Sequence, residues 1–196
     1  MTHWTLPNIL TFFRLLAAPA VALVFLALPR PAADWVALAL FLIAALSDYL
    51  DGWIARTWDQ RSPLGAMLDP IADKAIVVIA LSVFLGLHGL IFWILVPTIV
   101  ILWREVIVAG LREFLGGSVA TLRVTKLAKW KTAVQMAAIA FMFAWGAVAH
   151  TPDDITTASR ALYYGAPTLM WAAAALTLVT GYDYMRKAFT YLERAP

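Results

Sequence analysis

Six long apolar stretches constrain the fold of this chain more than any other feature of its sequence. Each is long enough to cross a bilayer as a helix, which takes about 20 residues. An open sheet cannot satisfy its backbone hydrogen bonds in hydrocarbon, so the stretches predict helices. We expect the spans near Ile9–Leu28, Trp35–Ile54, Ile71–Gly89, Leu90–Leu111, Lys131–Val148 and Ala161–Tyr182. The predicted fold class is therefore all-α integral membrane, with six transmembrane helices in a single domain over residues 1–196.

The composition of the chain also indicates lipid rather than water as its surroundings. The chain is 63% hydrophobic and only 14% charged, whereas a soluble domain carries about 25% charged residues. The sequence contains no cysteine, which excludes disulfides, thiolate nucleophiles and sulfur-ligated metals. Turns or loops are predicted at Pro29-Arg30-Pro31, Gly116-Gly117 and Thr151–Arg160.

The basic residues predict how the chain is oriented in the membrane. Loops on the cytoplasmic side of membrane proteins carry an excess of Lys and Arg. With the N-terminus inside, only Arg30 and Arg160 of the 15 basic residues fall in the opposite loops. We therefore expect both termini to be cytoplasmic. Topology also accounts for the net charge of +3, so no nucleic-acid partner is expected.

Four aspartates lie at the predicted cytoplasmic border of the second and third spans. Asp48 and Asp51 are three residues apart, and Asp69 and Asp73 are four apart. These spacings place side chains on one face of a helix. The turn between the spans returns the chain to the same membrane surface. Two antiparallel helices can therefore present all four carboxylates to each other.

Divalent metal ions explain this cluster of acids. A charged side chain within a membrane helix costs roughly 2.5–3.5 kcal/mol even on the gentler insertion scale. Mg²⁺ and Mn²⁺ prefer oxygen ligands, and two such ions balance four carboxylates. A pair of ions about 3.5–4 Å apart is a recurring device for phosphoryl transfer. The sequence thus predicts two divalent cations, Mg²⁺ or Mn²⁺, as cofactors.

The residues between the acids are consistent with a phosphate ligand. Gly52 and Gly65 lack a Cβ, which lets backbone or ligand approach closely. Arg56 carries a planar guanidinium that can bind a phosphate at two points. A cation transporter is a distant alternative, because it predicts acids near the bilayer midplane rather than at one border. Helix capping or surface ion pairing explains one such acid better than four.

The run Asp48-x-x-Asp51-Gly52-x-x-Ala55-Arg56-x8-Gly65-x-x-x-Asp69-x-x-x-Asp73 resembles the signature of the CDP-alcohol phosphotransferase family at every fixed position. The resemblance implies that the four aspartates bind the metals and that Asp73 is the catalytic base. It also implies a homodimer and a binding site for CDP-diacylglycerol. The donor contacts, partly by analogy, are Asn8, Thr11, Arg14, Gly52, Ala55, Arg56 and Gly65.

Further stretches are similar to one bacterial branch of this family, whose members make phosphatidylglycerophosphate. They are Leu6–Thr11 leading to Arg14, Leu68–Lys74, Arg104-Glu105 with Leu111-Arg112-Glu113, and Lys129–Thr132 followed by Gln135. The resemblance implies that CDP-diacylglycerol and sn-glycerol 3-phosphate give phosphatidylglycerophosphate and CMP at the cytoplasmic side of the bacterial inner membrane. The same chemistry with inositol phosphate, serine or a phospholipid as acceptor is the alternative.

The acceptor's phosphate needs a cationic pocket of its own. Arg104 and Arg112 lie eight residues apart, just over two turns, and so point the same way from one helix. Lys126, Lys129 and Lys131 begin the next helix, whose N-terminal amides also favour anions. We expect these five residues to bind glycerol 3-phosphate. Anchoring at the interface, or contact with anionic headgroups of membrane lipids, is the alternative for each.

Overall fold

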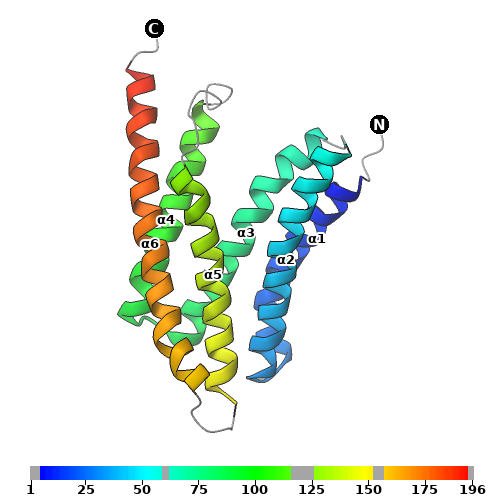
Figure 1. Ribbon diagram of the computed structural model, residues 1–196, viewed down its shortest axis with the longest axis vertical. Helices are drawn as coiled ribbons and strands as arrows, with labels where there is room; N and C mark the ends of the chain where they lie inside the picture. Colours follow the sequence, from blue (N-terminus) through cyan, green and yellow to red (C-terminus); the bar gives the residue numbers. More distant parts are fainter. Residues whose placement is uncertain (1–4, 59–61, 116–125, 152–156, 194–196) are drawn as a thin grey trace. The chain divides into compact units, whose positions relative to one another are not determined.

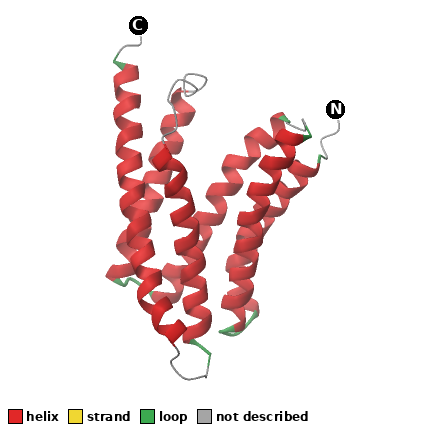
Figure 2. Cartoon of the chain, viewed as in Figure 1, coloured by secondary structure: helices red, strands yellow, loops and turns green. Residues whose placement is uncertain are grey.

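The protein consists of six helices in the computed structural model, which describes residues 5–58, 62–115, 126–151 and 157–193. Regular structure within these ranges is entirely helical (Figures 1 and 2). The helices are α1 (Leu6–Ala27), α2 (Ala32–Thr57), α3 (Pro63–His88), α4 (Phe92–Leu115), α5 (Lys126–Ala149) and α6 (Thr157–Leu192). Each contains a stretch long and apolar enough to cross a membrane, so the predicted fold class is confirmed.

The start of α3 differs from the sequence prediction. The helix begins at Pro63 rather than at Ile71, because Ser62 caps it. The Ser62 Oγ accepts a hydrogen bond from the amide of Gly65 at 2.9 Å, and a proline in the first turn suits the fixed φ of that residue. Asp69 therefore lies inside the helix and not at its start.

Helix α6 is longer than its apolar stretch. It runs for 36 residues, from Thr157 to Leu192, whereas the prediction covered Ala161–Tyr182. At about 1.5 Å per residue this is roughly 54 Å, and the hydrocarbon core of a bilayer is about 30 Å thick. Part of α6 must therefore extend beyond the hydrocarbon.

The structure agrees with some of the predicted loops and differs at others. The turn at Pro29-Arg30-Pro31 joins α1 to α2 as expected. The loop predicted over Thr151–Arg160 is shorter, since helix resumes at Thr157. Gly116-Gly117 lies outside the described residues. The end of α3 is marked by Gly89, whose φ of 68° is a conformation that glycine adopts without a steric penalty.

Contacts divide the chain into two compact units. The first comprises Met1–Gly89 with Ile139–Ala166, and the second comprises Leu90–Ala138 with Pro167–Pro196. A single domain over residues 1–196 stays a prediction.

In the first unit, α1 packs along both α2 and α3, which contact each other far less (Figure 1). The buried face of α1 changes character along the helix: Ala17, Ala18 and Val21 are apolar, whereas the preceding turns bury polar side chains. Small residues let helices approach closely in a membrane. Those buried polar residues are Asn8, Thr11 and Arg14, spaced by three. Helix α1 thus directs a polar stripe toward the part of the unit that holds the acids.

The second unit contains α4, most of α6 and the first half of α5. The Trp171 indole nitrogen donates a hydrogen bond to the carbonyl oxygen of Trp93 at 3.1 Å. Their rings also meet edge to face, with centroids 5.9 Å apart. This contact joins α4 to α6.

Candidate active site

Arg14 of α1 joins three of the four predicted metal ligands. Its Nη1 donates to Oδ1 of Asp48 at 2.8 Å and also to Oδ1 of Asp73. Its Nη2 donates to Oδ2 of Asp51. The arginine side chain is 1% exposed. One guanidinium therefore gathers carboxylates from both α2 and α3.

The fourth acid, Asp69, is held by a different residue of the same helix. Thr11 donates from Oγ1 to Oδ1 of Asp69 at 2.7 Å. Thr11 and Arg14 are three residues apart and therefore share one face of α1. The prediction had the acids of α2 and α3 facing each other directly. The structure adds side chains of α1, which contact all four.

The four acids differ in their access to solvent. The Asp51 side chain is 4% exposed, whereas those of Asp48 and Asp73 are 49% and 50% exposed. Asp51 therefore faces the interior of the unit. Asp48 and Asp73 present carboxylates that a ligand can reach.

The composition of the cluster fits divalent cations. Four ionised carboxylates and one guanidinium leave three uncompensated negative charges, and oxygen ligands suit Mg²⁺ and Mn²⁺. Among the residues that the structure describes, no three acids or histidines form a ready ligand group as they stand. The guanidinium of Arg14 lies between the acids, so cation binding requires these carboxylates to share or exchange partners.

Two glycines near the acids make room for neighbouring side chains. A Cβ on Gly65 would lie 2.8 Å from Oδ1 of Asn8, and that oxygen accepts a hydrogen bond from Ser62 Oγ at 2.7 Å. A Cβ on Gly52 would lie 3.2 Å from Nη1 of Arg56, whose guanidinium rests against its own helix. The side chain of Ala55 lies outside the description. No role was predicted for Ser62, although a serine before a proline is a recognisable helix start.

Two of the predicted acceptor residues, Arg104 and Lys131, meet in the second unit. Arg104 and Lys131 are both buried. Arg104 Nη1 donates to Glu105 Oε1 at 3.2 Å, and Lys131 Nζ donates to the same oxygen. Two cations thus share one carboxylate, which leaves a net positive charge in the interior. Arg112 is exposed, with its guanidinium carbon 5.5 Å from the centre of the Tyr184 ring.

The other two predicted acceptor lysines cannot be placed. Lys126 and Lys129 lie in the first turn of α5, but their side chains are outside the described part of the chain. They stay predictions.

Gln135 is a further polar residue of the second unit, for which no binding role was predicted. It lies one turn after Lys131 on α5 and is 4% exposed. Within the described residues its Oε1 has no hydrogen-bond partner, and the same is true of Arg104 Nε and Thr177 Oγ1. A buried polar atom without a partner costs about 1–3 kcal/mol. The second unit thus buries polar atoms that a ligand could satisfy.

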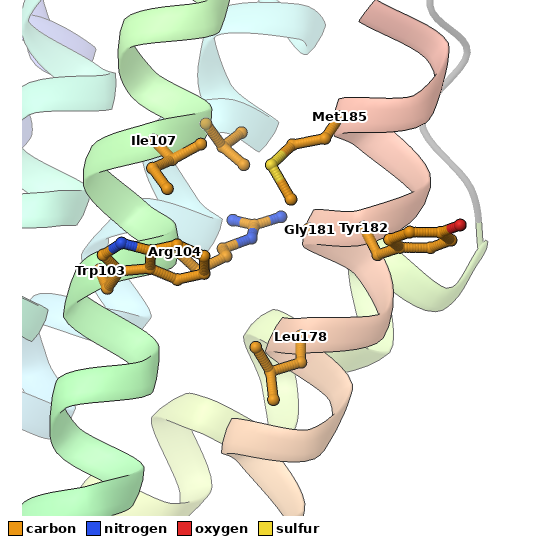
Figure 3. Close-up of a pocket in the computed structure, with 8 residues that line it drawn as sticks. Trp103, Arg104, Ile107, Leu178, Gly181, Tyr182 and Met185 are labelled. Carbon is orange, nitrogen blue, oxygen red and sulfur yellow. The ribbon is translucent and has the colours of Figure 1, made fainter. Parts of the chain in front are cut away.

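A pocket of about 210 Å³ lies between α4 and α6 (Figure 3). Its walls are mainly apolar and include Trp103, Leu178 and Met185. Arg104 extends from α4 toward Gly181 of α6, where a Cβ would lie 2.8 Å from the arginine Cγ. Gly181 therefore makes room for the arginine. Of the predicted acceptor residues whose side chains the structure describes, only Arg104 lines this pocket.

Six membrane-crossing helices and an acidic cluster joined by an arginine define a multi-pass membrane protein with a polar site in its helices. Residues 4–179 match the family described as CDP-alcohol phosphatidyltransferase. The chain belongs to this family, as its sequence predicted.

Curated relatives resemble the chain over two thirds of its length or more. A protein of Cereibacter sphaeroides is 49% identical, covering 97% of this chain and 98% of its own. A protein of Salmonella choleraesuis is 34% identical over 95% and 96%, and one of Haemophilus influenzae is 38% identical over 69% and 74%. Each is named CDP-diacylglycerol–glycerol-3-phosphate 3-phosphatidyltransferase.

Proposed function

We propose that this protein transfers the phosphatidyl group of CDP-diacylglycerol to sn-glycerol 3-phosphate, giving phosphatidylglycerophosphate and CMP. The observation that carries the proposal is the meeting of acids from α2 and α3 around Arg14. A cluster of this charge suits the metal-assisted displacement of a diphosphate. The names of the relatives supply the acceptor.

Asp48, Asp51, Asp69 and Asp73 hold two divalent cations in this proposal, Mg²⁺ or Mn²⁺. Bound there, the cations neutralise charge on the donor diphosphate and on the departing CMP. The donor lies against the faces of α1, α2 and α3 that adjoin the acids. Its contacts are Asn8, Thr11, Arg14, Gly52, Ala55, Arg56 and Gly65.

Asp73 is the catalytic base of the proposed reaction. It takes the proton from the acceptor hydroxyl, whose oxygen then attacks the phosphorus that bears diacylglycerol. The bond from that phosphorus to the bridging oxygen breaks in line, and CMP leaves with the electron pair. Asp73 suits this role better than Asp51, because the side chain of Asp73 is half-exposed and within reach of a substrate, whereas that of Asp51 is buried.

The acceptor's phosphate binds cationic side chains of the second unit. Arg104 and Lys131 carry two positive charges against the single carboxylate of Glu105. Gln135 Oε1 accepts a hydrogen bond from a glycerol hydroxyl, which satisfies a buried atom. The remaining acceptor contacts are Arg112, Lys126 and Lys129.

The protein functions in the bacterial inner membrane as a homodimer, with both termini and the active site on the cytoplasmic side. The asymmetric distribution of Lys and Arg supports this orientation, and the relatives cited above are bacterial proteins. The length of α6 is consistent with a C-terminal part that extends into water.

A panel of acceptors tests the proposed function. Purified protein receives CDP-diacylglycerol, Mg²⁺ and one labelled acceptor: glycerol 3-phosphate, inositol 1-phosphate, serine or phosphatidylglycerol. We expect label to enter lipid, with one CMP released for each transfer, only with glycerol 3-phosphate. A higher kcat/KM with another acceptor would contradict the proposal that glycerol 3-phosphate is the acceptor. Mn²⁺ flux into liposomes without CMP release would instead favour transport.

A further inference from the structure

Arg14 makes more ionic contacts than any other described residue of the first unit. Its two terminal nitrogens reach three carboxylates on two helices, and its side chain is almost fully buried. A buried charge is tolerated only when it is paired and hydrogen-bonded. Arg14 and the acids are therefore mutually dependent: the three acids compensate the buried guanidinium, and the guanidinium compensates the buried carboxylate of Asp51.

The carboxylate oxygens that Arg14 contacts belong to proposed metal ligands. Oδ1 of Asp48 and Oδ1 of Asp73 accept from the same nitrogen, so these two oxygens are close neighbours. A divalent cation bound by both acids needs oxygens in this region, and it carries twice the charge of a guanidinium. Arg14 and a divalent cation thus compete for one set of carboxylates.

We propose that Arg14 is a built-in counter-cation of the acidic cluster. It holds Asp48, Asp51 and Asp73 together before divalent cations bind, and it releases them as the cations take their place. The inference rests on the proposed function only in taking these aspartates as metal ligands.

Charge balance gives the released guanidinium a second partner. Two divalent cations neutralise the four aspartates, which leaves the single positive charge of Arg14 uncompensated. The diphosphate of the donor brings two negative charges, and an arginine fork suits phosphate oxygens. Arg14 therefore exchanges carboxylates for diphosphate, which reconciles its contacts with the donor-binding role that the sequence predicts.

Binding of Mn²⁺ to the purified protein, without lipid substrate or turnover, tests this exchange. Free Mn²⁺ is measured by electron paramagnetic resonance in titrations of wild type, Arg14→Gln and Arg14→Lys. We expect Arg14→Gln to bind Mn²⁺ at least about fivefold more tightly, a typical size for coupling between two sites. Arg14→Lys should bind with intermediate affinity, because an ammonium keeps the charge but cannot bridge three acids.

Thermal unfolding of the same proteins gives a second readout. Without Mn²⁺, Arg14→Gln should unfold at least about 5 °C below wild type, since the acids lose their counter-charge. Saturating Mn²⁺ should raise its Tm more than that of wild type. Lys187→Gln is the control, because its exposed ammonium pairs with Asp183 and not with the acidic cluster. Its Mn²⁺ affinity should equal that of wild type.

The possible outcomes separate this inference from the proposed function. Unchanged or weaker Mn²⁺ binding by Arg14→Gln overturns the exchange while leaving the metal site in place. If that variant does not fold, Arg14→Lys decides: an affinity equal to or below that of wild type also overturns it. If wild type binds no Mn²⁺, or Asp51→Asn binds it as wild type does, the metal assignment fails and the exchange fails with it.

Discussion

Thr11 in α1 donates a hydrogen bond from Oγ1 to Oδ1 of Asp69 in α3, across 2.7 Å. The two residues are far apart in sequence, and the bond fixes one carboxylate of the acidic cluster from a neighbouring helix. Together with Arg14, it makes α1 a wall of the site. A neutral residue that hydrogen-bonds a metal ligand, as Thr11 does, orients that ligand, and its loss typically costs about 10–100-fold in metal affinity or activity.

Replacing Thr11 by valine should weaken the metal site by about tenfold, since valine keeps the shape of threonine but cannot donate to Asp69. The measurement is the Mg²⁺ concentration that gives half-maximal CMP release. Thr11→Ser retains the hydroxyl and should stay within about threefold of wild type. Equal Mg²⁺ dependence of wild type and Thr11→Val would show that this bond does not support the site.

Replacing Gly65 by alanine should lower both stability and turnover. Its Cβ would come 2.8 Å from Asn8 Oδ1, a distance that forces the Asn8–Ser62 pair to move. We expect a cost of about 1–3 kcal/mol, as for other overpacked sites. Gly86→Ala is the matched control on the same helix, because no side chain of the described residues beyond its chain neighbours lies within 4 Å of a Cβ there. Similar Tm values for the two variants would contradict the close packing of α1 on α3.

Replacing Gly146 by alanine should reduce stability without changing substrate affinity. Gly146 of α5 lies against the ion pair of Arg30 with Asp34, and a Cβ there would be 2.6 Å from Arg30 Nη2. Asp34 is almost fully buried, so displacing Arg30 leaves the buried carboxylate of Asp34 without its counter-charge. The Tm should fall by several degrees while the KM for both substrates stays constant. Gly165→Ala, with open space around its Cβ, should match wild type.

Replacing Lys131 by alanine should raise the KM for glycerol 3-phosphate at least about tenfold, with little change in the KM for CDP-diacylglycerol. A hydrogen bond to a charged group contributes about 1.5–3 kcal/mol, which is the basis of this figure. Gln135→Leu should act in the same direction. Lys187→Ala, which removes an exposed lysine paired with Asp183, should have no effect. An unchanged KM for glycerol 3-phosphate in Lys131→Ala would show that this lysine does not bind the acceptor.

The six helices could be predicted because long apolar runs are a local property of sequence. Their ends could not, since polar residues also continue a helix once a cap such as Ser62 starts it. The same limit explains why α6 runs past Tyr182. Hydropathy identifies the part of a helix in lipid, not the whole helix.

The sequence predicted the acidic pairs of two helices and their meeting at one membrane surface, but not the third helix that contacts them. Spacing within α2 and α3 placed pairs of aspartates on one face, but it contained no information on which third helix would pack there. A signal was present in Asn8, Thr11 and Arg14, polar residues spaced by three in an otherwise apolar span. Their contact with the acids depends on packing, which spacing alone does not define.

Dependence of transfer on divalent cations tests the central claim most directly. Purified protein is incubated with CDP-diacylglycerol and labelled glycerol 3-phosphate, first with Mg²⁺, then after chelation, and finally with Mg²⁺ restored. We predict that labelled phosphatidylglycerophosphate forms in the first and last conditions only, and that Asp73→Asn forms almost none in any. Transfer that continues at an unchanged rate after thorough chelation would contradict the account.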